Sequence, residues 1–393
     1  MNNPSYLAEF VYLCTMIAYK YKLYRTNRTK HLEKMLREAC FVWNHALALQ
    51  KRYYSLYKKY ASCNRMQKHF AKRIDRCLLH SQTVQEILQR LDTSYQRFFS
   101  HMAKRPPKFK KVKDFSSFLF KQGGFKLSGN RFTVNKISKT YKFSLSRPYE
   151  GKVRTVAVKR SPLGEYYIVI TTDAKPGKYG KTHDGASVGI DFGLRTYMTF
   201  SDGTKVQSPR YLKREMPSLR KRGRALSKSK SGSNHHEQRR KELNREYERI
   251  IHCRNDWQWK LAHELCRKYD RIFIEDLQLT GMYSLWGGKM SDLAHAEFVT
   301  KLQYVATKYD VTVHKIDRYY PSSKTCTCGN VNHGLQLYER TWTCPVCGKT
   351  HDRDLLASVN ILRQGIAELG SGSKSHKHSQ GRSHDSHQTI HCK

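Results

Sequence analysis

Three carboxylates stand where the chain could place a reactive centre. Asp191 and Glu275 each end a short apolar run, and Asp354 opens an apolar, helix-like stretch. Open α/β sheets place functional groups at the ends of their strands. Carboxylates held close together repel one another, so such a group requires protonation or a bound cation. Hard carboxylate oxygens suit Mg²⁺ or Mn²⁺, and a pair of these ions activates water and stabilises the leaving oxygen in phosphodiester hydrolysis.

Each of these residues alone has an ordinary structural explanation. An Asp at a strand end is commonly a turn former or a helix cap. N-capping of the following helix would alone account for Asp354. For Asp276, a position beside a turn would be a sufficient structural explanation. The three carboxylates in this order, with cysteines ahead of the third, favour a nuclease. Asp352 competes with Asp354 for the third position, and we prefer Asp354 because it directly precedes the helix.

Four cysteines form the second cluster of chemical interest. The later pair has the spacing C-P-V-C followed by Gly, which lets two thiolates reach one tetrahedral Zn²⁺. The earlier pair has the shorter spacing C-x-C, so His333 or His351 can replace a ligand, and a degenerate knuckle without metal is the alternative. One metal site, with the other cysteines scattered, suits a reducing cytosol. The predicted zinc ligands are Cys326, Cys328, Cys344 and Cys347.

The chain is strongly basic. Its 393 residues contain 73 Lys and Arg against 32 Asp and Glu, a formal net charge of +41. A charge of this size repels itself unless a polyanion neutralises it, which argues against an ordinary metabolic enzyme and indicates a nucleic-acid partner. Hydrophobic residues, at 38%, are sufficient for folded cores. The apolar stretch 10–19 is too short to span a bilayer, so we expect no membrane partner.

The N-terminal half reads as strands around a helical insertion. Residues 16–25 alternate apolar and basic positions, which predicts a strand with one packed face and one face of lysines. Residues 29–103 follow the three-four spacing of helices. A basic loop at 104–113 contains Phe109, a combination suited to phosphate contact and base stacking. Residues 115–175 are β-rich and can close a small barrel with the first strand.

The C-terminal half reads as an α/β domain. A strand is expected at 187–192, followed by a basic helical region over 212–268 that is broken at 227–233. Two more strands are expected at 271–275 and 311–316. Strands alternating with long helices indicate a sheet that contains parallel strands.

Cations and aromatic rings in the basic segments are the candidates for nucleic-acid contact. Basic side chains neutralise phosphates, and aromatic rings between them stack on bases. A solvated basic face without a partner is the alternative for the strand. The candidate residues are Tyr19, Lys20, Lys22, Tyr24, Arg25, Lys108, Lys110, Lys111, Arg239 and Arg240.

Several of these motifs resemble one family. Residues 322–326 (S-S-K-T-C) and 344–354 (C-P-V-C-G-K-T-H-D-R-D) are similar to the C-terminal part of TnpB, the RNA-guided nuclease of bacterial and archaeal insertion sequences. Residues 188–193 (V-G-I-D-F-G) and 274–277 (I-E-D-L) are similar to its first two RuvC motifs. The start at 20–25 and the loop with Lys-Phe-Lys-Lys fit its N-terminal half. TnpB is a relative of type V CRISPR effectors.

The resemblance implies a fold of several parts. It implies an α/β, RuvC-like (RNase H-type) nuclease domain with an inserted zinc ribbon, behind an N-terminal split β-barrel that carries a helical recognition insertion. The expected boundaries are an extension at 1–15, the wedge-like β-barrel domain at 16–28 and 104–180, the recognition lobe at 29–103, the nuclease domain at 185–320 and 351–366, the zinc ribbon at 321–350, and a disordered Ser-, His- and Lys-rich tail at 367–393.

The resemblance also implies the activity. The protein is expected to bind a guide RNA from the transposon end and to cleave complementary target DNA beside a short motif, as a metal-dependent endodeoxyribonuclease. The trio of Asp191, Glu275 and Asp354 is expected to be catalytic and to hold Mg²⁺ or Mn²⁺, while the cysteines hold structural Zn²⁺. We expect a cytoplasmic, nucleoid-associated protein of a bacterium or archaeon, and we leave monomer and dimer open.

The chain departs from the family pattern in three places. Leu356 stands at the family's Asn position after Asp354, and the first cysteine pair is one residue short. Met16 stands where the family's chains usually begin, so residues 1–15 are an extension or a misassigned upstream start. Two alternatives follow for the function. One is an RNA-guided DNA-binding protein with weak or no cleavage, and the other is a guide-free RuvC-like nuclease or RNA chaperone.

Overall fold

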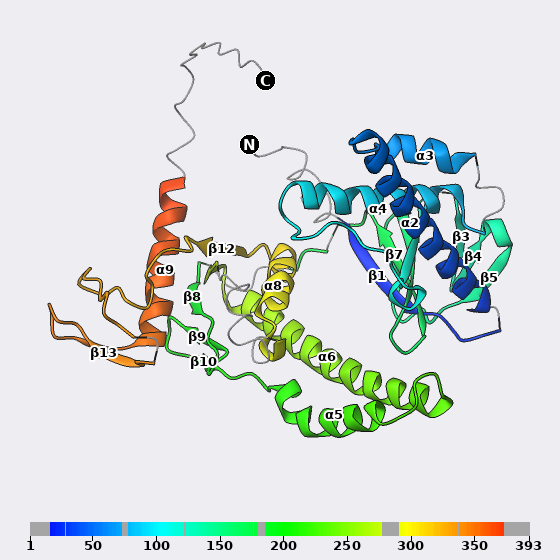
Figure 1. Ribbon diagram of the computed structural model, residues 1–393. Coiled ribbons are helices and arrows are strands. Elements are labelled where there is room, and N and C mark those ends of the chain that lie inside the picture. Colours follow the sequence, from blue (N-terminus) through cyan, green and yellow to red (C-terminus); the bar gives the residue numbers. More distant parts are fainter. Residues whose placement is uncertain are drawn as a thin grey trace, which may run out of the picture. The chain divides into compact units, whose positions relative to one another are not determined.

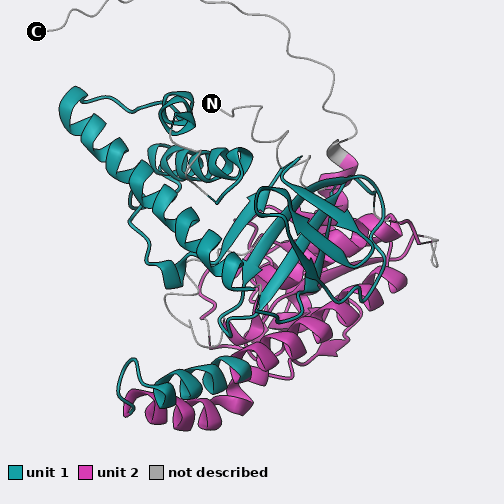
Figure 2. Cartoon of the chain, turned by 90° about the vertical axis from the view of Figure 1, so that its right-hand side faces the viewer, with its two compact units in different colours: residues 1–176, 229–245 teal, residues 177–228, 246–393 magenta. Residues whose placement is uncertain are grey.

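The computed structural model describes residues 16–372, with the exception of 28, 73–77, 122, 176, 180–184, 277–290 and 337. The expected extension and the chain beyond 372 lie outside the described residues. The chain divides into two compact units (Figure 2), of which unit 1 is residues 1–176 with 229–245 and unit 2 is residues 177–228 with 246–393. No described helix has both the length and the apolar content that a membrane crossing requires.

The described residues of 29–103, where helices were expected, form three helices of unit 1 (Figure 1). They are α2 (Thr29–Tyr57), α3 (Cys63–Ala71) and α4 (Ser81–Phe99). The apolar stripe of α2 returns every three or four residues and buries Leu32, Met35 and Leu36 completely. α3 begins where the hydroxyl of Ser62 accepts a hydrogen bond from a backbone N–H of the first turn (3.4 Å). The helical prediction for this segment is confirmed.

The strands of unit 1 form two antiparallel sheets (Figure 1). Their bounds are β1 Ile17–Lys22, β2 Ser117–Phe120, β3 Phe125–Ser128, β4 Arg131–Val134, β5 Lys139–Lys142, β6 Val153–Arg160 and β7 Tyr166–Thr172, with 3-10 helices at Val112–Asp114 and Asn135–Ile137. The larger sheet has the order β1-β7-β6-β2 and the smaller β3-β4-β5. A single bridge between Leu23 and Phe143 connects the ends of β1 and β5. The segment is β-rich as expected, but its described strands leave β1 and β2 as edges and close no barrel.

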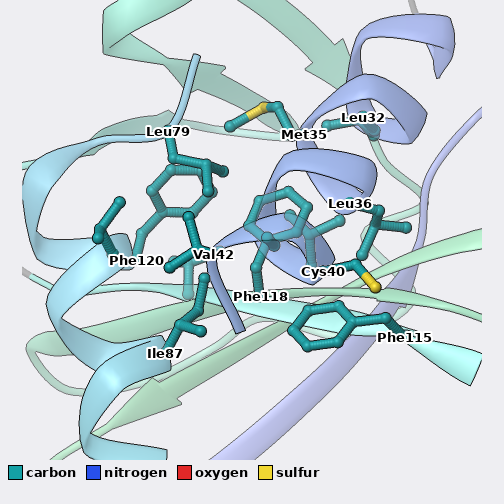
Figure 3. Packing of buried hydrophobic residues seen from close by; sticks show 14 of the residues in the cluster. Leu32, Met35, Leu36, Cys40, Val42, Leu79, Ile87, Phe115, Phe118 and Phe120 are labelled. Carbon is teal, nitrogen blue, oxygen red and sulfur yellow. The ribbon is translucent and has the colours of Figure 1, made fainter. Parts of the chain in front are cut away.

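Figure 3 shows the core of unit 1, where side chains of two helices meet a strand of the larger sheet. Leu36 and Val42 come from α2, and Ile87 comes from α4. They pack in one cluster with Phe118 and Phe120 of β2, and all five are at most 5% exposed. Each such apolar side chain contributes about 1.5–3 kcal/mol on burial. The helical insertion is therefore fixed to the sheet.

Unit 2 is built on a mixed five-stranded sheet with the order β10-β9-β8-β11-β12. The strands are β8 Ser187–Asp191, β9 Met198–Phe200, β10 Lys205–Val206, β11 Arg271–Glu275 and β12 Thr312–Ile316, and a hairpin is formed by β13 Thr341–Thr343 and β14 Thr350–Asp352. β8, β11 and β12 are parallel, whereas β9 and β10 are antiparallel. The helices are α5 Tyr211–Ser227, α8 His295–Tyr309 and α9 Arg353–Gly372, together with residues 246–268 of α6 (Asn234–Lys268), whose first part belongs to unit 1. The α/β prediction with parallel strands is confirmed.

Two glycines allow α9 to lie directly on the sheet. A Cβ atom at Gly189 of β8 would stand 2.1 Å from the carbonyl oxygen of Ser358, and one at Gly365 would stand 2.0 Å from the ring of Phe273. α9 continues to Gly372, so residues 367–372, expected to begin the disordered tail, are helical. A helix that is already nucleated extends through a glycine at a cost of only about 1 kcal/mol.

Candidate active site and zinc centre

The ends of two neighbouring strands bring the first two carboxylates together. β8 and β11 are parallel partners that pair Ile190 with Ile274, so Asp191 and Glu275 leave the same edge of the sheet. α9 packs against β8, and Asp354 lies in its first turn. The charge of Asp191 interacts with those of Glu275 and Asp354. The structure therefore places Asp191 and Glu275 at one edge of the sheet, with Asp354 on α9 near enough for its charge to act on Asp191. Among the described residues, only the four cysteines form a set of possible metal ligands within 4.8 Å of one another, so a shared ion at the carboxylates stays a prediction.

Burial opposes the ionisation of Asp191 and Glu275, and like charge adds to this effect at Asp191. Burial raises the pKa of Asp191 well above its usual range, and the carboxylates of Glu275 and Asp354 raise it further. Burial also raises the pKa of Glu275, although a hydrogen bond from the hydroxyl of Ser322 acts in the opposite direction. A bound proton or a bound cation relieves the cost of charge at Asp191 and Glu275 in such surroundings.

A buried set of hydrogen bonds fixes Glu275 from the loop that leads to the cysteine cluster. Ser322 is 5% exposed, and its hydroxyl donates to a carboxylate oxygen of Glu275. The side-chain amide of Asn360, on α9, donates to the backbone carbonyls of Ser322 (2.8 Å) and Thr325 (2.6 Å). Sequence reasoning missed Ser322 and Asn360 as functional residues. The polar Asn360 within the apolar run of α9 was the available signal.

The two acidic residues of the Asp-Arg-Asp sequence, Asp352 and Asp354, have different partners in the structure. The carboxylate of Asp352 accepts hydrogen bonds from the backbone N–H groups of Asp354 (3.0 Å) and Leu355 (3.1 Å), so it caps the start of α9. Asp354 instead interacts with Asp191 and pairs with Arg340 at 3.2 Å. The geometry favours Asp354 as the third carboxylate and gives Asp352 a structural position. Arg340 was not identified from the sequence.

Asp276, directly after Glu275, has its own partners. Its carboxylate pairs with Lys315 at 3.3 Å and with Arg318. Burial raises the pKa of Asp276, but hydrogen bonds from Arg318 and Lys315 outweigh it and hold the pKa below its usual range. The residue therefore ties the end of β11 to the segment around β12. The turn that the sequence interpretation places after Asp276 lies outside the described residues.

The four predicted zinc ligands lie together. Their sulphur atoms are all within 4.8 Å of one another. The sulphurs of Cys326 and Cys347 are 3.5 Å apart, and those of Cys328 and Cys344 are 3.7 Å apart. A tetrahedral Zn²⁺ with bonds of about 2.3 Å requires sulphur separations of about 3.8 Å. The donor set and its geometry fit a structural zinc ion.

A tighter turn accommodates the shorter cysteine pair. The backbone N–H of Gly329 donates to the carbonyl of Cys326 (3.0 Å), as that of Gly348 does to Cys344 (2.9 Å). Both glycines have positive φ angles, +91° and +69°, which a side chain would strain. The first turn is one residue shorter than the second, yet each presents its thiols to the cluster.

Neighbouring groups shift the pKa values of two thiols in opposite directions. The backbone N–H of Cys347 lowers the pKa of the Cys344 thiol to about 6. The backbone N–H of Lys349 lowers the pKa of Cys347, but the neighbouring cysteine thiols outweigh it and raise this pKa to about 11. The Nε2 atom of His351 lies 3.1 Å from the sulphur of Cys326, which places this histidine beside a ligand rather than in the ligand set. His333 is exposed and lies outside the cluster formed by the described residues.

The departure at Leu356 lies in the core beside the cysteines. Leu356 is 5% exposed and packs in one cluster with Trp342 and Cys344. The apolar side chain therefore stabilises the contact between α9 and the cysteine-bearing segment. Asp354, on the same helix, keeps its interaction with Asp191.

The predicted contacts on β1 divide between the two faces of the strand. Lys20 and Lys22 are exposed; Lys20 lies over a tyrosine ring at 4.3 Å, and Lys22 pairs with Glu165 at 2.6 Å. Tyr19 is only 7% exposed and packs in the core with Tyr21. The expectation that Tyr19 contacts nucleic acid is corrected, because the alternation of the strand places it on the buried face.

A second group of predicted contacts lines a cavity of about 1050 Å³ in unit 1. Tyr24 is 51% exposed and lies at its edge with Arg25. Arg240 of α6 also lines it and donates to the carbonyl of Pro162 (3.2 Å), while Arg239 is half-buried on the same helix. Cations outnumber acids on its wall by eight to three, and only Lys22, Arg25 and Arg240 of these cations were predicted. Its cations are Lys22, Arg25, Lys30, Lys113, Arg160, Arg240, Lys241 and Arg245.

The basic loop contains the remaining predicted contacts. Lys108 and Lys111 are exposed. Lys110 is half-buried, with its ammonium 3.8 Å from the ring centroid of Trp43, and burial lowers its pKa. Lys110 therefore helps to hold the loop, and its contact with phosphate stays a prediction.

Two family models match parts of the chain. Residues 171–285 match the family OrfB_IS605, described as "Probable transposase". Residues 295–361 match the family described as "Cas12f1-like, TNB domain". The first stretch contains Asp191 and Glu275, and the second contains Asp354 with the four cysteines.

Similar proteins match most of the chain. A protein of Streptomyces pristinaespiralis, named "Putative RNA-guided DNA endonuclease", is 33% identical over 296 residues, which are 74% of this chain and 72% of that protein. InsQ of Escherichia coli strain K12, with the same description, is 26% identical over 90% of this chain and 94% of its own length. Among solved structures, Cas12f1 in its complex with sgRNA and target DNA shares the fold, with a TM-score of 0.53 over 92% of this chain and 86% of that chain at 13% identity.

Proposed function

This chain belongs to the TnpB family, and on that premise we propose that it is an RNA-guided DNA endonuclease of a transposable element. It takes a guide RNA from the transposon end and cleaves complementary DNA next to a short motif. The observation that carries the proposal is the convergence of Asp191, Glu275 and Asp354 in a chain of net charge +41. Guide pairing supplies sequence recognition, while the protein binds the shape and charge of the nucleic acid.

The carboxylate site fits Mg²⁺ or Mn²⁺ because it offers several hard oxygen donors whose mutual repulsion a cation relieves. Such ions, when bound, supply an activated water and stabilise the leaving oxygen. Asp191 and Glu275 offer their oxygens from the ends of paired strands, and Asp354 offers its own from α9. Ser322 holds the Glu275 carboxylate in place through its hydrogen bond.

The architecture supports an assignment of domains. We assign the five-stranded sheet with α9 to a RuvC-like, RNase H-type nuclease domain and the segment with the four cysteines to a zinc ribbon. In unit 1 we assign the two sheets to a wedge-like β domain, whose larger sheet is open at β1 and β2, and α2, α3 and α4 to the recognition lobe. The cationic side chains of both units serve to bind guide RNA and target DNA.

The test is to express the chain with its native flanking DNA, purify it and sequence the RNA that accompanies it. A single discrete RNA that reaches into the flanking element supplies the target sequence for a cleavage assay with Mg²⁺. We expect cleavage of the matching DNA by the wild type and none by Asp191→Ala, with DNA binding nearly unchanged. Heterogeneous RNA without target cleavage would reject the guided nuclease.

Two neighbouring acids provide a matched comparison. Glu275→Gln removes a proposed metal ligand, so cleavage should fall by several orders of magnitude. Asp276→Asn changes the next residue, whose partners are Lys315 and Arg318, and cleavage should stay within about tenfold of the wild type. Equal losses in both variants would show that the strand end, rather than the carboxylate of Glu275, is what cleavage requires.

A further inference from the structure

The basic loop of unit 1 presents an aromatic ring to solvent. Phe109 is 54% exposed and lies between Lys108 and Lys111, which are also exposed. Lys51 of α2 places its ammonium 4.7 Å from the centroid of the Phe109 ring. An exposed ring bordered by cations is how proteins stack on unpaired bases while they bind the phosphates of the same strand.

Side chains of α2 clamp the loop backbone on both sides of Phe109. The indole N–H of Trp43 donates to the carbonyl of Lys108 (3.2 Å). The side chain of Asn44 donates to the carbonyl of Lys110 (2.8 Å) and accepts from its backbone N–H (2.9 Å). One amide therefore satisfies both backbone groups of Lys110. A loop fixed in this way loses little conformational entropy when a ligand binds to its tip.

The side chain of Lys110 reinforces the clamp. Its ammonium lies 3.8 Å from the ring centroid of Trp43, a residue that is 2% exposed. The thiol of Cys40 also contacts the Lys110 carbonyl at 3.3 Å. Lys110 is thus engaged with the helix, while the adjacent Phe109 remains exposed. Packing within the protein does not account for an apolar ring held outward at this position.

We propose that Phe109 is a stacking site for an unpaired nucleobase, with Lys108 and Lys111 contacting the adjoining phosphates. The site rests on the proposed function and deepens it, because it names one contact to the bound nucleic acid. An unpaired base has a free π face, whereas bases in a duplex are already stacked on their neighbours. The same chemistry is present in single-stranded RNA and in displaced single-stranded DNA.

The test measures the binding of the full-length protein to fluorescent strands of uridine and of deoxythymidine, each about twenty nucleotides long, and to a duplex of similar length. Phe109→Ala should weaken single-strand binding by about fivefold or more, and Phe109→Trp should restore it. Duplex binding should be unchanged. Weaker binding of the uridine strand alone assigns the site to RNA, and weaker binding of both strands assigns it to either nucleic acid.

The salt dependence of binding separates stacking from charge. Phe109→Ala removes no charge, so the slope of log affinity against log salt should stay as in the wild type. Lys111→Ala should reduce the slope by about one phosphate contact. Asn44→Ala keeps the ring but releases the loop, and it should weaken single-strand binding without changing this slope.

Phe41→Ala is the matched control, because Phe41 is also an exposed phenylalanine of the same unit, at 66% exposure on α2. It should leave single-strand binding unchanged. Two results would overturn the stacking site. In one, Phe109→Ala binds single strands as tightly as the wild type does; in the other, it loses as much affinity for the duplex as for single strands. If the wild type performs guided cleavage but Phe109→Ala binds single strands normally, the proposed function stands and only the stacking site is rejected. If Phe109→Ala binds single strands more weakly but the wild type cleaves no DNA, the stacking site stands and the proposed function is rejected.

Discussion

The hydroxyl of Ser322 donates a hydrogen bond to Glu275, a residue 47 positions earlier in the chain. This contact joins the loop that enters the cysteine cluster to a proposed metal ligand at the end of β11. The amide of Asn360 holds the carbonyl of Ser322 from α9, the helix that also carries Asp354. Two of the three carboxylates are therefore positioned by the same connected group of residues.

Removal of this hydroxyl should weaken the metal site. Partners that orient metal-binding carboxylates typically contribute about 10–100-fold in metal affinity, so Ser322→Ala should bind Mn²⁺ at least about tenfold more weakly. Ser322→Thr keeps the hydroxyl and should recover most of the affinity. Mn²⁺ binding followed by electron paramagnetic resonance measures this directly. The neighbouring Ser323→Ala serves as the control, and unchanged Mn²⁺ affinity in Ser322→Ala would reject the positioning role.

The two acids at the start of α9 should respond differently to substitution. Asp352→Ala removes the cap of α9 and its 3.0 Å pair with Lys205, so the protein should lose about 0.5–2 kcal/mol of stability. Asp354→Asn relieves repulsion with Asp191 but also removes the 3.2 Å pair with Arg340, so its stability should change by less than about 1 kcal/mol, and it should not cleave DNA. Thermal melting and cleavage assays distinguish the variants. Loss of cleavage with Asp352→Ala and retention with Asp354→Asn would reverse the assignment.

The pH dependence of the Asp352 contribution follows from its surroundings. Burial raises its pKa, but the backbone N–H of Leu355 and the ammonium of Lys205 outweigh that effect, so the pKa lies below its usual range. The stabilisation is therefore fully present above the unfolded-state pKa of about 3.9 and is lost as the pH falls through the folded-state pKa. The melting difference between the wild type and Asp352→Ala should narrow on acidification below about pH 4. A difference that widens would contradict the cap.

Zinc should be a structural requirement of cleavage. The cysteine cluster precedes β14, which runs directly into α9 and Asp354. Elemental analysis should give about one Zn per chain, and Cys344→Ser should lower both the zinc content and the melting temperature. Cys253→Ser changes a cysteine outside the cluster and should do neither. Full zinc content in Cys344→Ser would show that this thiol is not a ligand.

The sequence predicted the elements whose periodicity is strong. The strand that contains Tyr21 and the helix that contains Leu36 appear as expected, because their apolar spacing matches one period throughout. Asp191 and Glu275 could be paired in advance because both end apolar strands, and parallel strands end at a common edge. The alternation of this strand also places Tyr19 on the face opposite the lysines, so the sequence pattern already indicates that Tyr19 is buried.

The remaining parts of the site depend on contacts that sequence spacing does not encode. The bonds from Ser322 to Glu275 and from Asn360 to the loop join distant segments, so no local pattern reveals them. Asp352 and Asp354 differ by two positions, and only the direction of each carboxylate separates the cap from the metal site. The anchoring role of Lys110 likewise depends on a ring from a distant helix.

Gly189 should be indispensable because α9 lies against it. A Cβ atom there would stand 2.1 Å from the carbonyl oxygen of Ser358, a backbone group that cannot rotate away. Gly189→Ala must therefore push α9 from β8, with a loss of at least about 1–3 kcal/mol of stability, and must move Asp354 away from Asp191. Lower melting together with weaker Mn²⁺ binding is the expected result. Gly223→Ala is the control, because a Cβ atom at this helical position would have no atom within 4 Å, and this change should stabilise the protein by about 0.5–1 kcal/mol. Stabilisation by Gly189→Ala as well would contradict the packing of α9 on the sheet.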